Sequence, residues 1–133
     1  MPWNYAIDTE RKLVISTGTG MIRSADLLEH QNRIVADKKF RRDFHQLVDL
    51  SEISAPEVDV AAVRAAAISN IYSAKSRRAF VVTDPVAVTL TKAFQSYRKE
   101  AGGKEQIRIF TNREEAMAWI LPDAHGEGRS RKP

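Results

Sequence analysis

Two short apolar runs, each ending in polar residues, constrain what this chain can fold into more than any other feature. The first is Gln46–Leu50, which carries Asp49 near its end and leads through Ser51 into residues 52–57, a segment that we expect to be a loop. The second is Ala79–Asp84. An apolar run of this length, followed by turn residues and a helical pattern, is typical of a buried parallel strand. Two such runs predict an α/β fold, in which ligands bind at the carboxyl ends of the strands.

The remaining strands show alternating apolar and polar residues. Residues 3–8 and 12–17 are expected to pair as a β-hairpin, and Gly18 and Gly20 are expected to end its second strand. Residues 107–110 alternate as an edge strand does. A hairpin followed by three αβ units and a closing helix predicts a five-stranded, mostly parallel sheet with right-handed crossovers.

Four helices are expected from apolar residues at helical spacing. Ser24 is placed to cap the first, Pro56 begins or Asp59 caps the second, Asp84 starts the third, and a capping box over residues 111–114 opens the fourth. The side chains expected to face inward are Leu27, Leu28, Ile34 and Val35 on the first helix; Val60, Val63, Ala67, Ile68 and Ile71 on the second; Val86, Leu90, Ala93, Phe94 and Tyr97 on the third; and Ala116, Met117, Trp119 and Ile120 on the last.

The composition indicates one soluble domain over residues 1–121. The chain has 133 residues, enough to bury a core, and no cysteine, which excludes thiolate nucleophiles, disulfides and thiolate zinc sites. No stretch approaches the roughly 20 apolar residues that span a bilayer, and the first residues do not resemble a signal peptide. We therefore expect a cytoplasmic protein without a transmembrane segment.

The net charge of +4 does not indicate a nucleic-acid-binding protein. Part of the positive excess lies in residues 122–133, which we expect to be a basic, disordered tail. Two basic clusters remain, one over residues 38–42 and one formed by Lys75, Arg77 and Arg78. Each precedes a predicted strand, so we expect solvated loop charges rather than a phosphate-contacting face.

Polar residues gather at the predicted carboxyl ends of the parallel strands. The residues expected to form a rim for a ligand or a partner are Asp49, Ser51, Ser54, Thr83 and Asp84. Each carboxylate also has a simpler structural interpretation, because an aspartate in such a position commonly caps a loop or a helix start.

The sequence predicts no catalytic residue, no metal site and no cofactor. His45 and Asp49 stand roughly 13 Å apart at the rise of a strand, too far for a relay. His30, His45 and His125 do not cluster in sequence, and no nucleophile elbow is present. The glycines at 18 and 20 resemble a dinucleotide fingerprint only superficially, since Arg23 occupies the position of its third glycine.

Four segments together resemble the SpoIIAA-like family, which belongs with STAS domains and shares its architecture with the lipid-carrying Sec14-like (CRAL-TRIO) proteins. These segments are residues 47–50, residues 78–84, the helix that contains residues 92–94, and residues 109–120. The resemblance implies strands in sequential order and helices mainly on one face. Members of the family are largely of unassigned function.

One motif of the STAS class is missing. Anti-sigma factor antagonists of that class carry an Asp-Ser-Ser-Gly motif whose serine is phosphorylated, and the equivalent region here, residues 51–59, contains only Ser54 near that position. Ser54 is therefore the candidate phosphorylation site that the resemblance implies.

Our leading hypothesis is a non-enzymatic STAS-like module for a protein partner, including a second copy of the chain, or for a small apolar ligand. In the inner strand Phe80 and Val82 lie on one face and Val81 on the other, so the face without helices needs a cover.

Three alternatives remain open. A lipid carrier or sensor would use an apolar groove formed by Val86, Val88, Leu90 and Phe94, and a partner switch would be controlled by phosphorylation at Ser54. The least favoured alternative is an enzyme with Asp49 or Asp84 as its general base.

Overall fold

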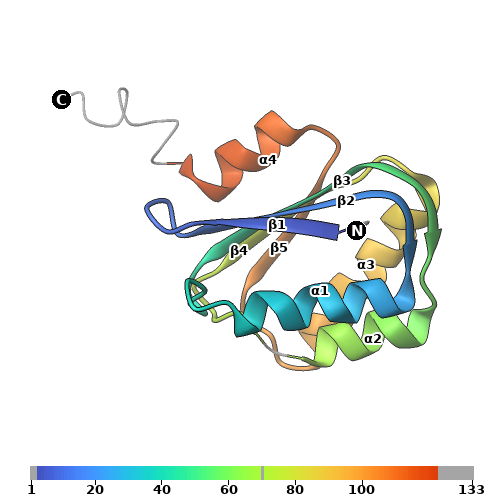
Figure 1. Cartoon of the computed structure of the whole chain (residues 1–133), viewed down its shortest axis with the longest axis horizontal. Coiled ribbons are helices and arrows are strands. Elements are labelled where there is room, and N and C mark those ends of the chain that lie inside the picture. Colours follow the sequence, from blue (N-terminus) through green and yellow to red (C-terminus); the bar gives the residue numbers. More distant parts are fainter. Residues whose placement is uncertain (1–2, 70, 123–133) are drawn as a thin grey trace.

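The strands form one sheet in the order in which they occur along the chain. A computed structural model describes residues 3–69 and 71–122. The strands are β1 (Trp3–Asp8), β2 (Leu13–Arg23), β3 (His45–Glu57), β4 (Arg77–Val81) and β5 (Gln106–Phe110), as Figure 1 shows. β1 pairs with β2 antiparallel, and all later neighbours are parallel. The predicted mixed sheet is confirmed, whereas residues 123–133 of the predicted tail, including His125, lie outside the described residues.

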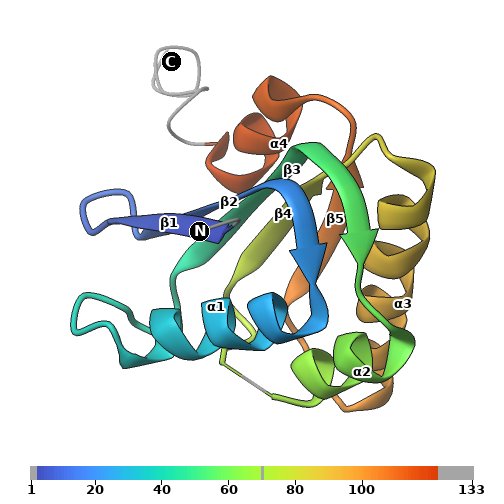
Figure 2. The ribbon, with the colours of Figure 1, turned by 45° about the vertical axis from the view of Figure 1, so that its right-hand side comes forward.

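Three helices cover one face of this sheet and a fourth covers the other. α1 (Ser24–Ala36), α2 (Val60–Ile68) and α3 (Pro85–Glu100) lie on the first face, and α4 (Arg113–Ile120) lies on the second (Figures 1 and 2). This arrangement confirms the expectation that helices lie mainly on one face.

The helix starts follow local capping chemistry. Asp59 and Asp84 accept hydrogen bonds from the N–H groups of Ala62 and Ala87 at the starts of α2 and α3. At α4 the cap is Asn112, inside the predicted capping box, and it accepts from Glu115. The prediction that Ser24 caps α1 is wrong, because Arg23 is the N-cap residue. Ser24 is the first helical residue, and its hydroxyl accepts instead from the N–H of Asp59, which ties α1 to α2.

The predicted inner faces of α1, α2 and α3 are partly wrong. Val35, Val60, Ile68 and Val86 are exposed. α2 ends before Ile71, and its buried residues are Ala62, Val63, Ala66 and Ala67. α3 buries Ala87, Thr91, Phe94 and Arg98. The residues of α2 itself are apolar on nearly all of its sides, so the sequence pattern does not show which side faces the sheet. On α3 the prediction failed because the buried face carries two polar residues.

β2 and β3 extend well beyond their predicted ends. Residues 18–20 lie inside β2, and residues 52–57, expected to be a loop, continue β3. The two strands stay paired through register shifts near Thr17 and Gly20, and Figure 2 shows both bending toward the layer of α1 and α2. The register shifts allow the strands to bend while they stay paired. The extended ends of β2 and β3 therefore form one side of the space beneath the helices instead of ending in loops at the edge of the sheet.

Gly18 is inside the strand because the core needs its small size. A Cβ atom there would lie 2.7 Å from Ile22 Cδ1 and 2.9 Å from Leu50 Cδ2. Trp3 also lies close by, and all three neighbours belong to the buried core on the side of α1, α2 and α3. Gly20 has a different role, since its φ of +64° is a backbone conformation that suits glycine.

α4 fills the face that the sequence seemed to leave uncovered. Leu13, Leu47, Ala79 and Val81 from the inner strands pack with α4 in a second, fully buried cluster. The expectation that a partner must cover this face is therefore wrong for the inner strands.

We predict that Gly18→Ala lowers the free energy of unfolding by about 1–3 kcal/mol, because the added methyl overpacks the core between Ile22 and Leu50. Gly20→Asn is the matched control. No atom lies within 4 Å of the position of its Cβ, and asparagine adopts positive φ at less cost than most residues, so this variant carries a modest backbone strain and no overpacking. Urea unfolding of both variants measures the difference, and equal losses would contradict the packing role of Gly18.

Candidate functional site

A cavity of about 110 Å³ lies between the sheet and the layer of α1, α2 and α3. Its walls are largely apolar, and the extended ends of β2 and β3 contribute to one side. The lining side chains that matter below are Trp3, His30, Gln46, Arg78, Leu90 and Phe94. The cavity is partly open to solvent, and an apolar recess with a few fixed polar groups is the usual form of a ligand site.

A row of buried polar side chains crosses the sheet beside this cavity. His30 Nε2 lies 2.9 Å from Ser16 Oγ. Gln46 Nε2 donates to the same hydroxyl at 3.0 Å, and Arg78 Nε donates to Gln46 Oε1 at 3.1 Å. All four residues are at least nine-tenths buried. The row thus connects α1, β2, β3 and β4 through hydrogen bonds inside the core.

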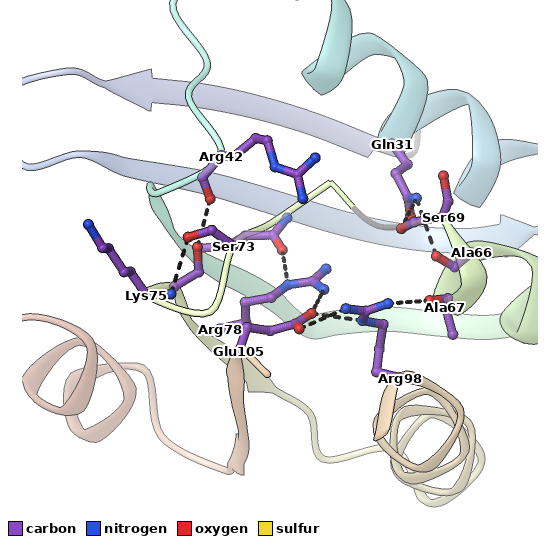
Figure 3. Close-up of polar contacts among 12 residues, drawn as sticks. Gln31, Arg42, Ala66, Ala67, Ser69, Ser73, Lys75, Arg78, Arg98 and Glu105 are labelled. Carbon is purple, nitrogen blue, oxygen red and sulfur yellow. Dashed lines mark hydrogen bonds and ion pairs between the residues drawn. The ribbon is translucent and has the colours of Figure 1, made fainter. Parts of the chain in front are cut away.

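The row ends in a buried ionic cluster. Glu105 lies between two arginines, with Oε2 at 3.2 Å from Arg78 Nη1 and Oε1 at 2.8 Å from Arg98 Nη2 (Figure 3). Arg98 Nε also donates to Glu105 Oε2, and Arg98 Nη1 donates to the carbonyl of Ala67. No more than 8% of any of the three side chains is exposed. Two cations and one anion leave this cluster with one excess positive charge.

Aromatic rings surround the guanidinium of Arg78. Its Cζ lies 4.4 Å from the ring centroid of Tyr72 and 5.1 Å from that of Phe94. Burial lowers the pKa of Arg78, while Tyr72 and Glu105 act in the opposite direction, and a guanidinium keeps its proton at neutral pH. Burial likewise raises the pKa of Tyr72, so its phenol is neutral.

His30 is a neutral imidazole at the other end of the row. Its ring stacks on Trp3 at a centroid distance of 4.5 Å, and burial, together with the charge of Arg33, lowers its pKa to about 4. Three buried polar atoms have no hydrogen-bond partner among the residues that the structure describes: His30 Nδ1, Trp3 Nε1 and Tyr72 Oη. Such orphaned atoms are uncommon in folded proteins.

Asp49 and Ser51, the first residues of the predicted rim, do lie together. Ser51 Oγ donates to Asp49 Oδ1 at 2.6 Å, and Arg113 of α4 forms an ion pair with Asp49 Oδ2 at 2.8 Å. Burial alone would raise the pKa of Asp49, but the hydrogen bonds from Ser51 and Arg113 outweigh it and hold that pKa below its usual value. A lowered pKa does not suit a general base at neutral pH.

The other rim residues lie apart from this pair. Asp84 caps α3, Thr83 is exposed, and Ser54 is exposed within the extension of β3. Of the predicted groove, Leu90 and Phe94 line the cavity and Val88 is partly buried against the same core, whereas Val86 is exposed.

The search for metal ligands and membrane spans gives two negative findings. Across residues 3–69 and 71–122, no group of three or more His, Asp or Glu side chains could hold a metal ion. No helix in that part of the chain is both long and apolar enough to cross a membrane.

His45 has a structural hydrogen bond, because its Nδ1 accepts from the backbone N–H of Arg77.

Sequence reasoning missed the polar row. Arg78 was assigned to a solvated basic cluster, and this was wrong: it is buried, because β4 turns it toward the helix layer. A usable signal was present, since Gln46 and Arg78 each directly precede the apolar run of a predicted buried strand, and the two positions are paired in the sheet. Arg98 and Glu105 carried no comparable signal, because charged residues near the end of a helix and in a loop are usually solvated.

Comparison with known proteins identifies the fold and nothing finer. No family model matches the chain, and no curated protein does. Among solved structures, the chain is similar to an uncharacterised protein of the DUF3478 family from Shewanella loihica PV-4, which has a SpoIIAA-like fold. The TM-score is 0.56 at 10% sequence identity, over 89% of this chain and 93% of that one. The SpoIIAA-like architecture implied by the sequence resemblance is therefore confirmed.

Glu105→Gln is predicted to destabilise the fold by about 3–5 kcal/mol, since it leaves two buried arginines without a carboxylate. Glu100→Gln, at the exposed end of α3, is the control and should change stability by less than about 0.5 kcal/mol. Chemical denaturation compares the two variants. Similar stabilities would show that the cluster does not depend on its anion.

His30 is predicted to make the fold less stable as the pH falls from 6.5 toward 4. In this window the unfolded chain protonates the imidazole at its ordinary pKa of 6.5, but the folded chain, with a pKa of about 4, does not. The loss is on the order of 3 kcal/mol and is complete near pH 4, and above pH 6.5 the contribution of His30 is constant.

Urea unfolding as a function of pH measures this loss, and His30→Gln should remove most of it. His45→Gln is the control. Burial also lowers the pKa of His45, but this side chain is only half-buried, so its variant should retain most of the slope. A pH dependence unchanged in His30→Gln would contradict the assignment.

Proposed function

We propose that this protein is a non-enzymatic, STAS-like binding module that holds a small, largely apolar molecule in the cavity between the sheet and the helix layer. The observation that carries the proposal is the cavity of about 110 Å³, lined by aromatic and aliphatic side chains and bounded by the polar row. Ligand sites in proteins are commonly apolar pockets with a few fixed polar groups. The SpoIIAA-like fold supports the module class.

The size of the cavity favours a small molecule over a whole lipid. An engineered cavity of about 150 Å³ is known to hold benzene, so a space of about 110 Å³ suits a single ring or a short branched chain. A lipid carrier would need a much larger space, which α3 could open only by leaving the sheet. Phe94 and Ala87 anchor α3 in the core, which opposes that movement.

The rim carboxylates support binding rather than catalysis. Asp84 satisfies the N-terminus of α3, and Asp49 is paired with Arg113 and has a lowered pKa. The lowered pKa of Asp49 does not suit a general base, and the carboxylate of Asp84 is occupied as a helix cap. The one observation that supports a phosphorylation switch at Ser54 is that this side chain is exposed. Ser54 lies in β3, whereas the STAS phosphorylation motif lies at the start of a helix.

A cavity-filling substitution tests the proposal. Small aromatic probes, namely toluene, benzyl alcohol and benzoate, are added to the purified full chain, and the melting temperature is followed by differential scanning fluorimetry. At about ten times the dissociation constant, at least one probe should raise the melting temperature by several degrees. Ala87→Leu extends a side chain that lines the cavity and should abolish the rise.

Ala65→Leu is the matched control, because it makes the same change at an exposed position of α2. It should respond to the probes as the parent protein does. Native mass spectrometry of the protein as purified adds an independent measurement, through the mass of any retained molecule. The absence of any response to all three probes would contradict the proposal.

A further inference from the structure

We infer that the molecule held in this cavity is a compact monocarboxylic acid and that Arg78 binds its carboxylate, an inference that rests on the proposed function. The charges of the core give the first reason. The side chains of Arg78, Arg98 and Glu105 are all buried, and among the described residues Glu105 is the one carboxylate paired with the two arginines, which leaves one excess positive charge. Burying an unbalanced charge is costly, and a bound monoanion would balance this one.

Arg78 is the arginine that a ligand can reach. It lines the cavity, and within residues 3–69 and 71–122 it donates two of the five N–H groups of a guanidinium, to Gln46 and Glu105. Arg98 does not line the cavity, and it is held by both oxygens of Glu105 and by the carbonyl of Ala67. A carboxylate in the cavity would therefore meet Arg78, whose planar fork suits such an acceptor.

The direction of the hydrogen bonds gives an independent reason. A guanidinium only donates, so the oxygen of Gln46 must face Arg78 and its NH₂ group must donate to Ser16. Ser16 Oγ accepts this bond, and among the described residues the only acceptor beside its own proton is His30 Nε2, so we assign the Ser16 hydroxyl as the donor to His30. The neutral imidazole of His30 then carries its proton on Nδ1.

With this tautomer, the two polar groups without a described partner in the lining residues are both hydrogen-bond donors. His30 Nδ1–H and Trp3 Nε1–H both belong to residues that line the cavity, and both are buried without a partner among the described residues. A donor-rich cavity calls for an acceptor. It does not suit a cation, and a plain hydrocarbon would leave both donors unsatisfied.

Charge and volume narrow the ligand class further. A dianion such as a phosphate monoester would replace one uncompensated buried charge with another of opposite sign. The remaining walls are apolar, with Leu90 and Phe94 from α3 facing the sheet. The chemistry that fits is a single carboxylate on a small aromatic ring or a short aliphatic body.

Isothermal titration with benzoate, toluene and phenyl phosphate tests the inference on the full chain. Benzoate should bind at least tenfold more tightly than either of the others. Arg78→Met removes the excess charge while Glu105 keeps Arg98 as its partner, so this variant should lose the preference for benzoate and still bind toluene.

The outcomes separate the inference from the proposed function. If no probe binds the parent protein, the cavity does not hold small molecules and both fail. If toluene binds as tightly as benzoate, or if Arg78→Met keeps the preference for benzoate, the carboxylate assignment is overturned while the binding module stands. Equal affinity for phenyl phosphate would also overturn it.

A second measurement does not depend on the variant folding. In benzoate labelled with ¹³C at the carboxyl carbon, the bound carboxylate should stay ionised to a lower pH than free benzoate, because Arg78 stabilises its charge. A bound carboxyl group that titrates like the free acid would contradict contact with Arg78.

Discussion

The ionic contact between Glu105 and its two arginines is the constraint on which the rest of the core depends. Glu105 precedes β5, Arg78 belongs to β4, and Arg98 lies near the end of α3 and also bonds to α2 through Ala67. One carboxylate thus fixes two strands and two helices relative to one another (Figure 3). Because the charges are desolvated, the contact holds only while all partners stay in place, which makes the whole helix layer cooperative.

The two faces of the sheet serve different purposes. α4 packs Ala116 and Ile120, flanked by Met117 and Trp119, against the apolar side chains of the inner strands. The other face combines aromatic rings, a polar row and a cavity. Consequently the buried polar groups of this face lie near the amino ends of β3 and β4, where Gln46 and Arg78 pair, and not at the carboxyl ends where α/β proteins usually place their sites.

The fold was predictable because its signals are local and repeated. Apolar runs, helix caps such as Asp59 and Asp84, and turn residues all lie within a few positions of the elements that they define. The candidate site was not predictable in the same way. Ser16, Gln46 and Arg78 come together only through strand register, and Glu105 acquires its role from residues 7 and 27 positions away. The end of β2 was mispredicted for a similar reason. A glycine at position 18 usually marks the end of a strand, but here it lies inside the strand because Ile22 and Leu50 leave no room for a side chain.

The polar row is not what stability alone would select. Replacing a buried ionic cluster by apolar residues of similar volume is often neutral or stabilising for a protein. This core nevertheless retains two arginines, one glutamate and a neutral histidine beside a space of about 110 Å³. Specificity of packing could account for a balanced pair, because each charge then fixes the position of the other. It does not account for the excess cation or for the donors of His30 and Trp3 that find no partner among the described residues, both of which cost free energy. An acceptor bound in the cavity, as we propose, would offset these costs, and for this reason we look for function at the helix-covered face rather than at the rim.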